Sequence, residues 1–459
     1  MGAKKPDALR RTLPLELPAR LTHIQLLSPG GFLERRTFLT SSLAASLLAL
    51  ADGSSSLSFA APPIRDYSFD RTISRNVLDN FLSRSITMQS LFAGRGELDD
   101  DLRMLTNMGA KFIGRSLCLW GGEANLLNNL ETAKRQVPVA VKADPEMLFE
   151  ACIFEIVTTQ VEQVAVPGWA FVGLGQSVES RNFSYADMLY PDGRRVDQWA
   201  PGSSVPDVSR PETKLYFYFL ARSFIDAGFE AIHYGQVEIM NGNDPDLTHW
   251  SQVFTLARAY AATHARRHML LCDAHVPHGG LVRDGHLLLD FHAFPLRIME
   301  VPDKPQEAIL KVGFSDGIYN RSRGGIAPSG WTCKHLPYLV EFDNYGVSKQ
   351  PGQARADGGQ FNWVWGYDEI TWFAHQDQQY RADWLRYAWH WVRTTDKNGY
   401  LEMPGSRVIT NGRRAMPGGT AEPHARRSRW YHANNPTAAV PDGMGDEETI
   451  RAIWAADSA

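Results

Sequence analysis

The chain has 459 residues, of which 44% are hydrophobic and 11% aromatic, and its formal net charge is −4. A chain of this length can bury a large core, and one barrel with insertions would account for most of it. The near-neutral charge and the lack of a polybasic run argue against nucleic acid as a partner.

The first 60 residues have the features of a targeting segment. The pair Arg35-Arg36 precedes an apolar run at 41–51 and small residues that end in Ala60. This order resembles a twin-arginine signal peptide. The apolar run is too short to span a bilayer comfortably. Residues 1–60 therefore predict export to the periplasm or the medium, without a stable membrane anchor.

Several motifs for other kinds of site are missing from the sequence. Neither GxGxxG after a strand nor GxxxxGK[ST] occurs, which removes the usual grounds for a nucleotide site. The cysteines form no CxxC pair, so a zinc ribbon is excluded, while one disulfide stays open. They are Cys118, Cys152, Cys272 and Cys333.

From residue 61 onward, strand-like and helix-like patterns alternate. Eight short apolar segments are the predicted strands: 85–92, 111–120, 169–174, 231–238, 269–273, 287–292, 336–343 and 361–367. Predicted helices lie between or after them, at 98–108, 124–134, 144–164, 211–227, 246–267 and 377–394. Such alternation favours parallel strands joined by right-handed crossovers. Eight strands of this kind predict an α/β fold of the (β/α)8 TIM-barrel type.

The barrel is expected to occupy residues 61–400. Residues 175–210 form a long polar insert after the third strand, on the side where barrels carry their catalytic loops. Residues 401–459 are rich in Gly and Pro, and we expect a C-terminal extension packed on the barrel.

Acidic residues recur at or near the ends of strands four to seven. They are in line with the apolar residues of one strand face, and they are Glu238, Asp273, Asp290 and Glu341. Active sites of parallel barrels lie at this end of the strands. The acids therefore predict a catalytic centre at the barrel mouth.

Glycosidic bond cleavage needs two carboxyl groups, one protonated and one ionised, ~5–5.5 Å apart for retention and ~6.5–9.5 Å apart for inversion. Strands four and seven lie on opposite sides of a barrel mouth and can present carboxyls across such a gap. Glu238 and Glu341 are therefore the predicted catalytic pair.

Acids that end strands four and seven resemble the arrangement of the (β/α)8-barrel glycoside hydrolases of clan A. The resemblance covers about residues 85–395 and points to no specific characterised family. It implies Glu238 as acid/base and Glu341 as nucleophile. Members of the clan usually have Asn directly before the acid/base; this chain has Val237 there, preceded by Gln236.

Further polar and aromatic residues near the predicted strand ends are expected to contact a carbohydrate substrate. They are Gln236, Asp273, His275, Asp290, His292, Asp343, Trp365, Tyr367, Asp368, Glu369 and Arg115. Aromatic faces stack on sugar rings, although core packing is the commoner role of any single Trp. His233 falls on the opposite face from Glu238, which favours a core histidine. This function requires neither a cofactor nor a metal.

Two alternatives remain open at this stage. Asp-x-His recurs at strands five and six, so Asp273, His275, Asp290 and His292, with His278, could bind a divalent ion in a metal-dependent barrel hydrolase. The barrel could also bind carbohydrate without cleaving it, which Val237 would explain.

Overall fold

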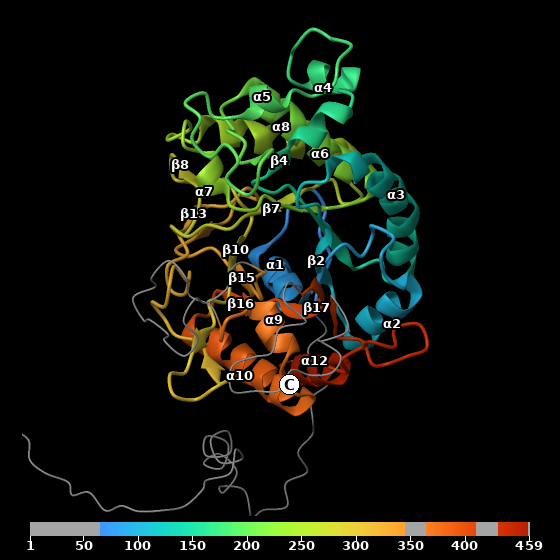
Figure 1. The fold of residues 1–459 in the computed structure, drawn as a ribbon, viewed down its shortest axis with the longest axis vertical. Coiled ribbons are helices and arrows are strands. Elements are labelled where there is room, and N and C mark those ends of the chain that lie inside the picture. The colour runs from blue at the N-terminus through green and yellow to red at the C-terminus, as the bar shows by residue number, and fades with distance from the viewer. Residues whose placement is uncertain (1–64, 345–363, 410–429, 458–459) are drawn as a thin grey trace, which may run out of the picture. The chain divides into compact units, whose positions relative to one another are not determined.

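A computed structural model describes residues 65–344, 364–409 and 430–457, so the expected signal peptide lies outside the described residues. The fold is mixed α/β and is built on parallel strands (Figure 1). No helix among the described residues is long and apolar enough to cross a membrane.

The largest sheet has seven strands in the order β18-β17-β1-β2-β3-β6-β7. Only the β17–β18 pair is antiparallel. The strands are β1 Ser85–Met88, β2 Phe112–Leu117, β3 Leu148–Cys152, β6 Ala231–His233, β7 Leu271–Asp273, β17 Met403–Val408 and β18 Trp430–His432.

A second parallel sheet contains β10 (His292–Pro295), β15 (Tyr338–Glu341) and β16 (Gly399–Leu401). One residue, Glu402, separates β16 from β17 of the first sheet. At the other edge, the N–H of Ala293 donates to the carbonyl of Ala274 at 3.0 Å, next to a parallel bridge between His275 and Ala293. Both edges of the second sheet therefore continue into the first.

Helices follow most of the parallel strands. The longer ones are α1 Arg75–Leu82, α2 Leu98–Met108, α3 Leu126–Ala143, α6 Pro211–Ala227, α8 Thr248–His264, α10 Gln378–Thr395 and α12 Glu447–Ala456. Local sequence sets their ends: Pro211 begins α6, Gly228 ends it at φ +102°, and the Asp377 side chain accepts from the N–H of Tyr380 at the start of α10.

Short elements fill the connections. The helical ones are α4 Gly168–Gly173, α5 Tyr185–Met188, α7 Val237–Met240, α9 Glu369–Ala374 and the 3-10 turns Glu123–Asn125 and Thr159–Gln163. The strand pairs are β4 Val157–Thr158 with β5 Ser203–Ser204, β8 Val282–Arg283 with β9 His286–Leu287, β11 Met299–Glu300 with β12 Ala308–Ile309, and β13 Gly325–Ile326 with β14 Thr332–Cys333.

The core lies between the strands and their covering helices. Phe92 and Phe149 meet edge to face at 5.1 Å, and Phe229 packs on the same ring of Phe92. Full burial of one such side chain contributes about 1.5–3 kcal/mol. The fully buried Trp250 and Trp372 belong to α8 and α9.

The prediction for the third strand was wrong. Residues 169–174 form helix α4, and the third parallel strand is β3, inside the segment 144–164 that was predicted to be a helix. A strand buried on both faces is a continuous apolar run, which a short window cannot distinguish from a helix. The connection after β3 therefore runs from residue 153 to Pro211.

Two further strands differ from their predicted bounds. The fourth ends at His233, because Gly235 turns the chain at φ +53° and a Cβ there would collide with the Glu155 carboxylate. The sixth pairs in parallel only from His292 onward, so Asp290 precedes that strand.

The prediction for the eighth strand was also wrong. Residues 364–367 form a tight turn, and 361–363 lie outside the described residues. The stretch 399–408, made of β16 and β17, pairs with both β15 and β1. The predicted end of the barrel at residue 400 falls inside this stretch. The aromatic run 361–367 has high strand propensity, but packing overrides such propensity.

Candidate active site

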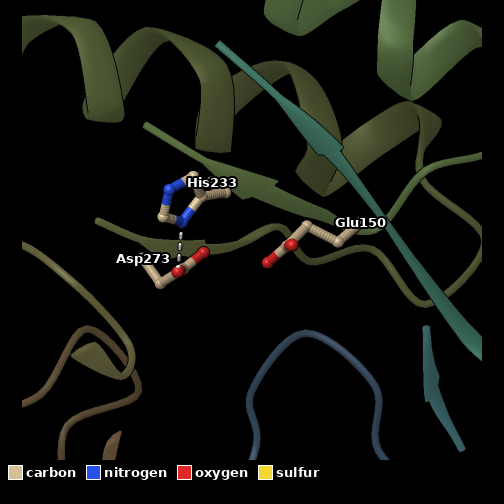
Figure 2. Close-up of side chains that lie close together, drawn as sticks. All are labelled: Glu150, His233 and Asp273. Carbon is tan, nitrogen blue, oxygen red and sulfur yellow. Dashed lines mark hydrogen bonds and ion pairs between the residues drawn. The ribbon is translucent and has the colours of Figure 1, made fainter. Parts of the chain in front are cut away.

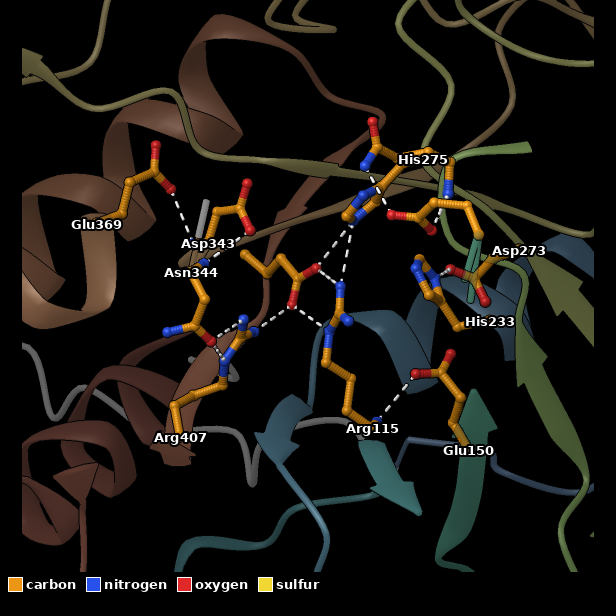
Figure 3. A network of polar contacts seen from close by, with 12 residues as sticks. Arg115, Glu150, His233, Asp273, His275, Asp343, Asn344, Glu369 and Arg407 are labelled. Atoms are coloured by element: carbon orange, nitrogen blue, oxygen red, sulfur yellow. Dashed lines mark hydrogen bonds and ion pairs between the residues drawn. The ribbon is translucent and has the colours of Figure 1, made fainter. Parts of the chain in front are cut away.

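Glu341 is the last residue of β15, and its buried carboxylate binds two arginines, Arg115 and Arg407, which are labelled in Figure 3. Arg115 Nε and Arg407 Nη1 each donate to Oε2 at 2.6 Å. Arg115 Nη2 also donates to Oε1, and His275 Nε2 lies 3.0 Å from the same oxygen. Both oxygens of Glu341 are therefore held by cationic or N–H donors.

These partners determine the charge of Glu341. Burial alone would raise the pKa of its carboxyl, but the charges of Arg115 and Arg407 and the hydrogen bond from His275 hold that pKa well below its usual range. Glu341 is therefore an ionised carboxylate at neutral pH.

Backbone irregularity places Arg115 in this position. Its φ is +54°, and the register between β2 and β3 shifts between Ile113 and Leu117. Such a bulge re-aims one side chain of a strand. The backbone N–H of Arg115 donates to Glu150 Oε2 at 3.0 Å, and this hydrogen bond stabilises the bulge.

Arg407 comes from the far end of the sequence, on β17. Its Nη2 and Nε donate to Asn344 Oδ1 at 2.9 and 3.2 Å, and the Asn344 amide donates to the carbonyl of Val408 at 2.8 Å. The guanidinium is thereby oriented between Asn344 and Glu341.

Glu238 lies on α7, not on a strand. Its carboxylate accepts from the N–H of His278 at 3.1 Å and pairs with the ring Nδ1 of the same residue. The side chain of Glu238 is 15% exposed, whereas that of Glu341 is 2% exposed. The two predicted catalytic acids therefore have different access to water.

A single loop contacts both acids. His275 binds Glu341, and His278, three residues later, binds Glu238. The N–H of His275 also donates to the carbonyl of Gly235, at 2.8 Å, just before α7. Burial lowers the pKa of His275. The same ring nitrogen, Nε2, also lies 3.2 Å from Arg115 Nη2.

Three other buried carboxyls lie on strands or between them, and no arginine side chain of the described residues forms a hydrogen bond with them: Glu150, Asp273 and Glu402. Figure 2 shows Glu150 and Asp273 facing each other beside His233, whose Nδ1 lies 2.7 Å from Asp273 Oδ2. A Cβ added at Gly114 would collide with the Glu402 carboxyl and lie 3.5 Å from Glu150, so these two acids share the space above Gly114.

Burial favours the uncharged form of this second group. Burial and the neighbouring Asp273 raise the pKa of Glu150 far above its usual range, and burial raises that of Asp273 likewise. Burial and the charge of Glu341 raise the pKa of Glu402. Among the described residues, Asp273 Oδ1, His233 Nε2 and Glu402 Oε1 have no hydrogen-bond partner.

One set of side chains in the described part of the chain has metal-ligand geometry. Ligand atoms of Glu150, His233 and Asp273 lie within 4.8 Å of one another, a donor set that suits a divalent ion. It shares only Asp273 with the predicted metal ligands. The others are engaged elsewhere: Asp290 with Arg258 and the N–H of Cys272, His292 with Ser322, His278 with Glu238 and His275 with Glu341.

The remaining predicted substrate residues fall into two groups. Gln236 is half-buried before α7, and its amide donates to Glu155 Oε1 at 2.6 Å. Asp343 follows β15 and accepts from Arg297 at 3.2 Å. The others are enclosed by protein, at 0–4% exposure: Trp365, Tyr367, Asp368 and Glu369.

The enclosed residues have structural partners. Asp368 caps α9 by accepting from Thr371, and Glu369 accepts the N–H groups of Ile298 and Asp343. Burial raises the pKa of Glu369 to about 8.

Sequence reasoning missed four residues of this site: Glu150, His233, Glu402 and Arg407. Glu150 stood in a predicted helix, and the two C-terminal residues stood in the predicted extension. His233 was expected to be a core histidine on the face opposite Glu238; it is buried, and its ring points toward Asp273 (Figure 3). The short apolar stretch of Tyr400, Leu401 and Met403 was the only local signal for the last strand, and Pro404 and Gly405 obscure it.

No protein-family model and no curated protein matches the chain. Solved structures to which the chain is similar include a debranching enzyme, a maltosyl-maltose hydrolase and an isomalto-dextranase. A debranching enzyme from Nostoc punctiforme is 10% identical, with a TM-score of 0.40, over 83% of this chain and 80% of that one.

A cyclic alpha-maltosyl-(1→6)-maltose hydrolase from Arthrobacter globiformis is 12% identical, with a TM-score of 0.41, over 83% of each chain. An isomalto-dextranase from Arthrobacter globiformis is 11% identical, with a TM-score of 0.32, over 61% of this chain and 50% of that one.

Proposed function

We propose that the protein is an exported glycoside hydrolase in which Glu341 is the ionised catalytic carboxylate and Glu238 the acid/base. The observation that carries this proposal is the environment of Glu341: a buried carboxylate at the end of a parallel strand, held ionised by Arg115 and Arg407. Such a group can stabilise or attack the positive charge that develops at the anomeric carbon.

Glu238 suits the second role because it is reachable. Its carboxyl is partly exposed and hydrogen-bonded to His278, so the pair can hold a proton beside a leaving group. The loop that carries His275 and His278 ties this acid to Glu341. The gap between the two carboxyls decides whether the product retains or inverts its anomeric configuration.

The proposed scaffold is a closed eight-stranded barrel. The parallel neighbours run in the order β1, β2, β3, β6, β7, β10, β15, β16–β17 and then β1 again. In that scaffold the connection 153–210 is the long insert at the mouth, and β18 with α12 is the C-terminal extension.

The export signal is part of the proposal and rests on the sequence alone. Replacing Arg35 and Arg36 by Lys is expected to abolish translocation through a twin-arginine pathway. Cell fractionation of the full chain and the double variant measures this. Equal export of both would remove the signal assignment.

Substitution of the two acids tests the catalytic assignment. On the glycoside that the wild type cleaves best, Glu341→Gln is expected to lower kcat by about 10²–10⁴-fold, whatever the leaving group. Glu238→Gln is expected to do so for poor leaving groups and much less for activated aryl glycosides, which need no protonation.

The matched control is Glu230→Gln. Glu230 is also buried and paired with two arginines, Arg266 and Arg267, but it precedes β6 at the opposite strand end from Glu238. Its loss is expected to lower stability and to leave kcat unchanged in the folded protein. If Glu341→Gln and Glu230→Gln had the same kcat, the site would lie elsewhere or the barrel would bind carbohydrate without cleaving it.

A further inference from the structure

Three aromatic rings form a cluster beside the candidate active site, which we call the aromatic platform: Trp120, Phe154 and Trp199. Trp120 packs against Trp199 at 5.1 Å, with planes at 67°, and against Phe154 at 5.4 Å. Trp120 is 52% exposed, and the other two rings are half-buried. The rings come from the segments after β2 and β3 and from the strand connection before α6.

The platform is fixed from below. The indole N–H of Trp199 donates to the carbonyl of Glu155 at 2.9 Å, and its backbone N–H donates to Ser203 at 3.2 Å. After Trp120 the chain turns through Gly121 and Gly122, at φ +68° and +73°. These contacts fix the position of Trp199 and the course of the chain after Trp120.

The platform is continuous with the carboxylates. The ring of Phe154 lies 5.4 Å from the guanidinium of Arg115, which binds Glu341. The carboxylate of Glu155 accepts from the side chain and backbone of Gln236, at 2.6 and 2.8 Å, directly before the helix of Glu238. The platform is thus linked to Glu341 through Arg115, and to the start of the Glu238 helix through Glu155 and Gln236.

We propose that the aromatic platform is a sugar subsite, in which a pyranose ring adjacent to the cleaved bond stacks on Trp120. An exposed indole held edge to face offers a flat apolar surface with a polar rim, and the C–H face of a pyranose matches such a surface. The aromatic residues predicted for this role, Trp365 and Tyr367, are only 4% and 0% exposed and are therefore not accessible to a sugar. The inference rests on the proposed function and names its substrate class as oligosaccharides of at least two pyranose units.

Kinetics of Trp120 variants test the subsite. For an oligosaccharide substrate, Trp120→Ala is expected to lower kcat/KM by about 5–100-fold, on the scale of the stacking of a nucleic-acid base on an aromatic side chain. Trp120→Phe keeps an aromatic face and is expected to recover most of this loss. The control is Val172→Ala, an apolar residue that is 65% exposed on α4. It should change nothing, and all variants should keep the wild-type circular dichroism and melting temperature.

A binding experiment separates failure of the subsite from failure of the proposed function. Calorimetric titration of wild type and Trp120→Ala with a panel of oligosaccharides reports binding without turnover. Binding that weakens at least fivefold in Trp120→Ala supports the subsite even if no hydrolysis is found. Hydrolysis and binding that both stay within twofold of wild type in Trp120→Ala overturn the subsite and leave the hydrolase standing. If the wild type neither binds nor cleaves any oligosaccharide of the panel, both the subsite and the proposed hydrolase function are overturned.

Discussion

Two groups of buried carboxyls lie close together in this protein and have opposite charge states. Glu341 contacts Arg115 and Arg407 and is ionised. Glu150 and Asp273 contact each other and His233, have no arginine side chain in direct contact, and are neutral. Burial acts on all three in the same direction, so the reach of two guanidinium groups decides which carboxyl carries charge.

The difference supports the choice of Glu341 as the proposed catalytic carboxylate. An ionised, desolvated carboxylate is costly to bury, and this chain provides a β2 bulge and a C-terminal strand to bring one arginine each to Glu341. The neutral group needs no such support. Its three carboxyls lie buried near Glu341.

The largest expected effect is a difference in stability between two variants, one that removes the ionised carboxylate and one that removes a neutral carboxyl. Glu341→Gln leaves two arginines without their shared carboxylate and is expected to lower the free energy of unfolding by about 3–5 kcal/mol. Asp273→Asn removes a neutral group and is expected to cost about 1 kcal/mol. Urea denaturation at pH 7 measures both, and equal costs would break the distinction.

The next effect concerns the pH dependence of catalysis. Arg407→Met removes one of the charges that lower the pKa of Glu341, so that pKa must rise. Because Glu341 acts ionised, the acidic limb of kcat/KM is expected to move to higher pH. Arg407→Lys keeps a positive charge at this position, so its acidic limb should move less than that of Arg407→Met. An acidic limb that stays in place would show that Glu341 does not control it.

A smaller effect is expected in the pH dependence of stability. The pKa of Glu402 is raised by folding, so the stability it contributes is complete below the pKa of the unfolded chain and is lost as pH rises toward the folded value. Glu402→Gln should flatten the fall in unfolding free energy above about pH 4.5, by at most about 1.4 kcal/mol per pH unit. Parallel curves for wild type and variant would refute a neutral Glu402.

The smallest expected effect is that of metal. If protons neutralise Glu150 and Asp273, a chelator should leave the melting temperature of the purified protein unchanged, and added zinc or manganese should raise it by less than about one degree. Stoichiometric metal in elemental analysis, lost in the variant His233→Ala, would instead assign the cluster of Figure 2 to a divalent ion.

Several elements were predictable because their pattern is local. The helix that begins after Asp377 and the strand that ends in Glu341 follow from a cap and from an apolar run. The predictions that failed concerned elements whose structure depends on contacts with distant parts of the chain. The strand around Glu150 reads equally as helix, and Arg407 joins the site only because β17 returns to pair with β1, some 300 residues earlier in the chain. Glu341 could be named from the sequence, whereas its arginine from β17 could not.

Neutron diffraction from crystals in D₂O near pH 6 tests the central claim most directly, since deuterium positions show which carboxyls are protonated. The account predicts no deuteron on either oxygen of Glu341, and a deuteron on Glu402 and on at least one of Glu150 and Asp273. A deuteron on Glu341, or a bare and ionised Glu150–Asp273 pair, would contradict it.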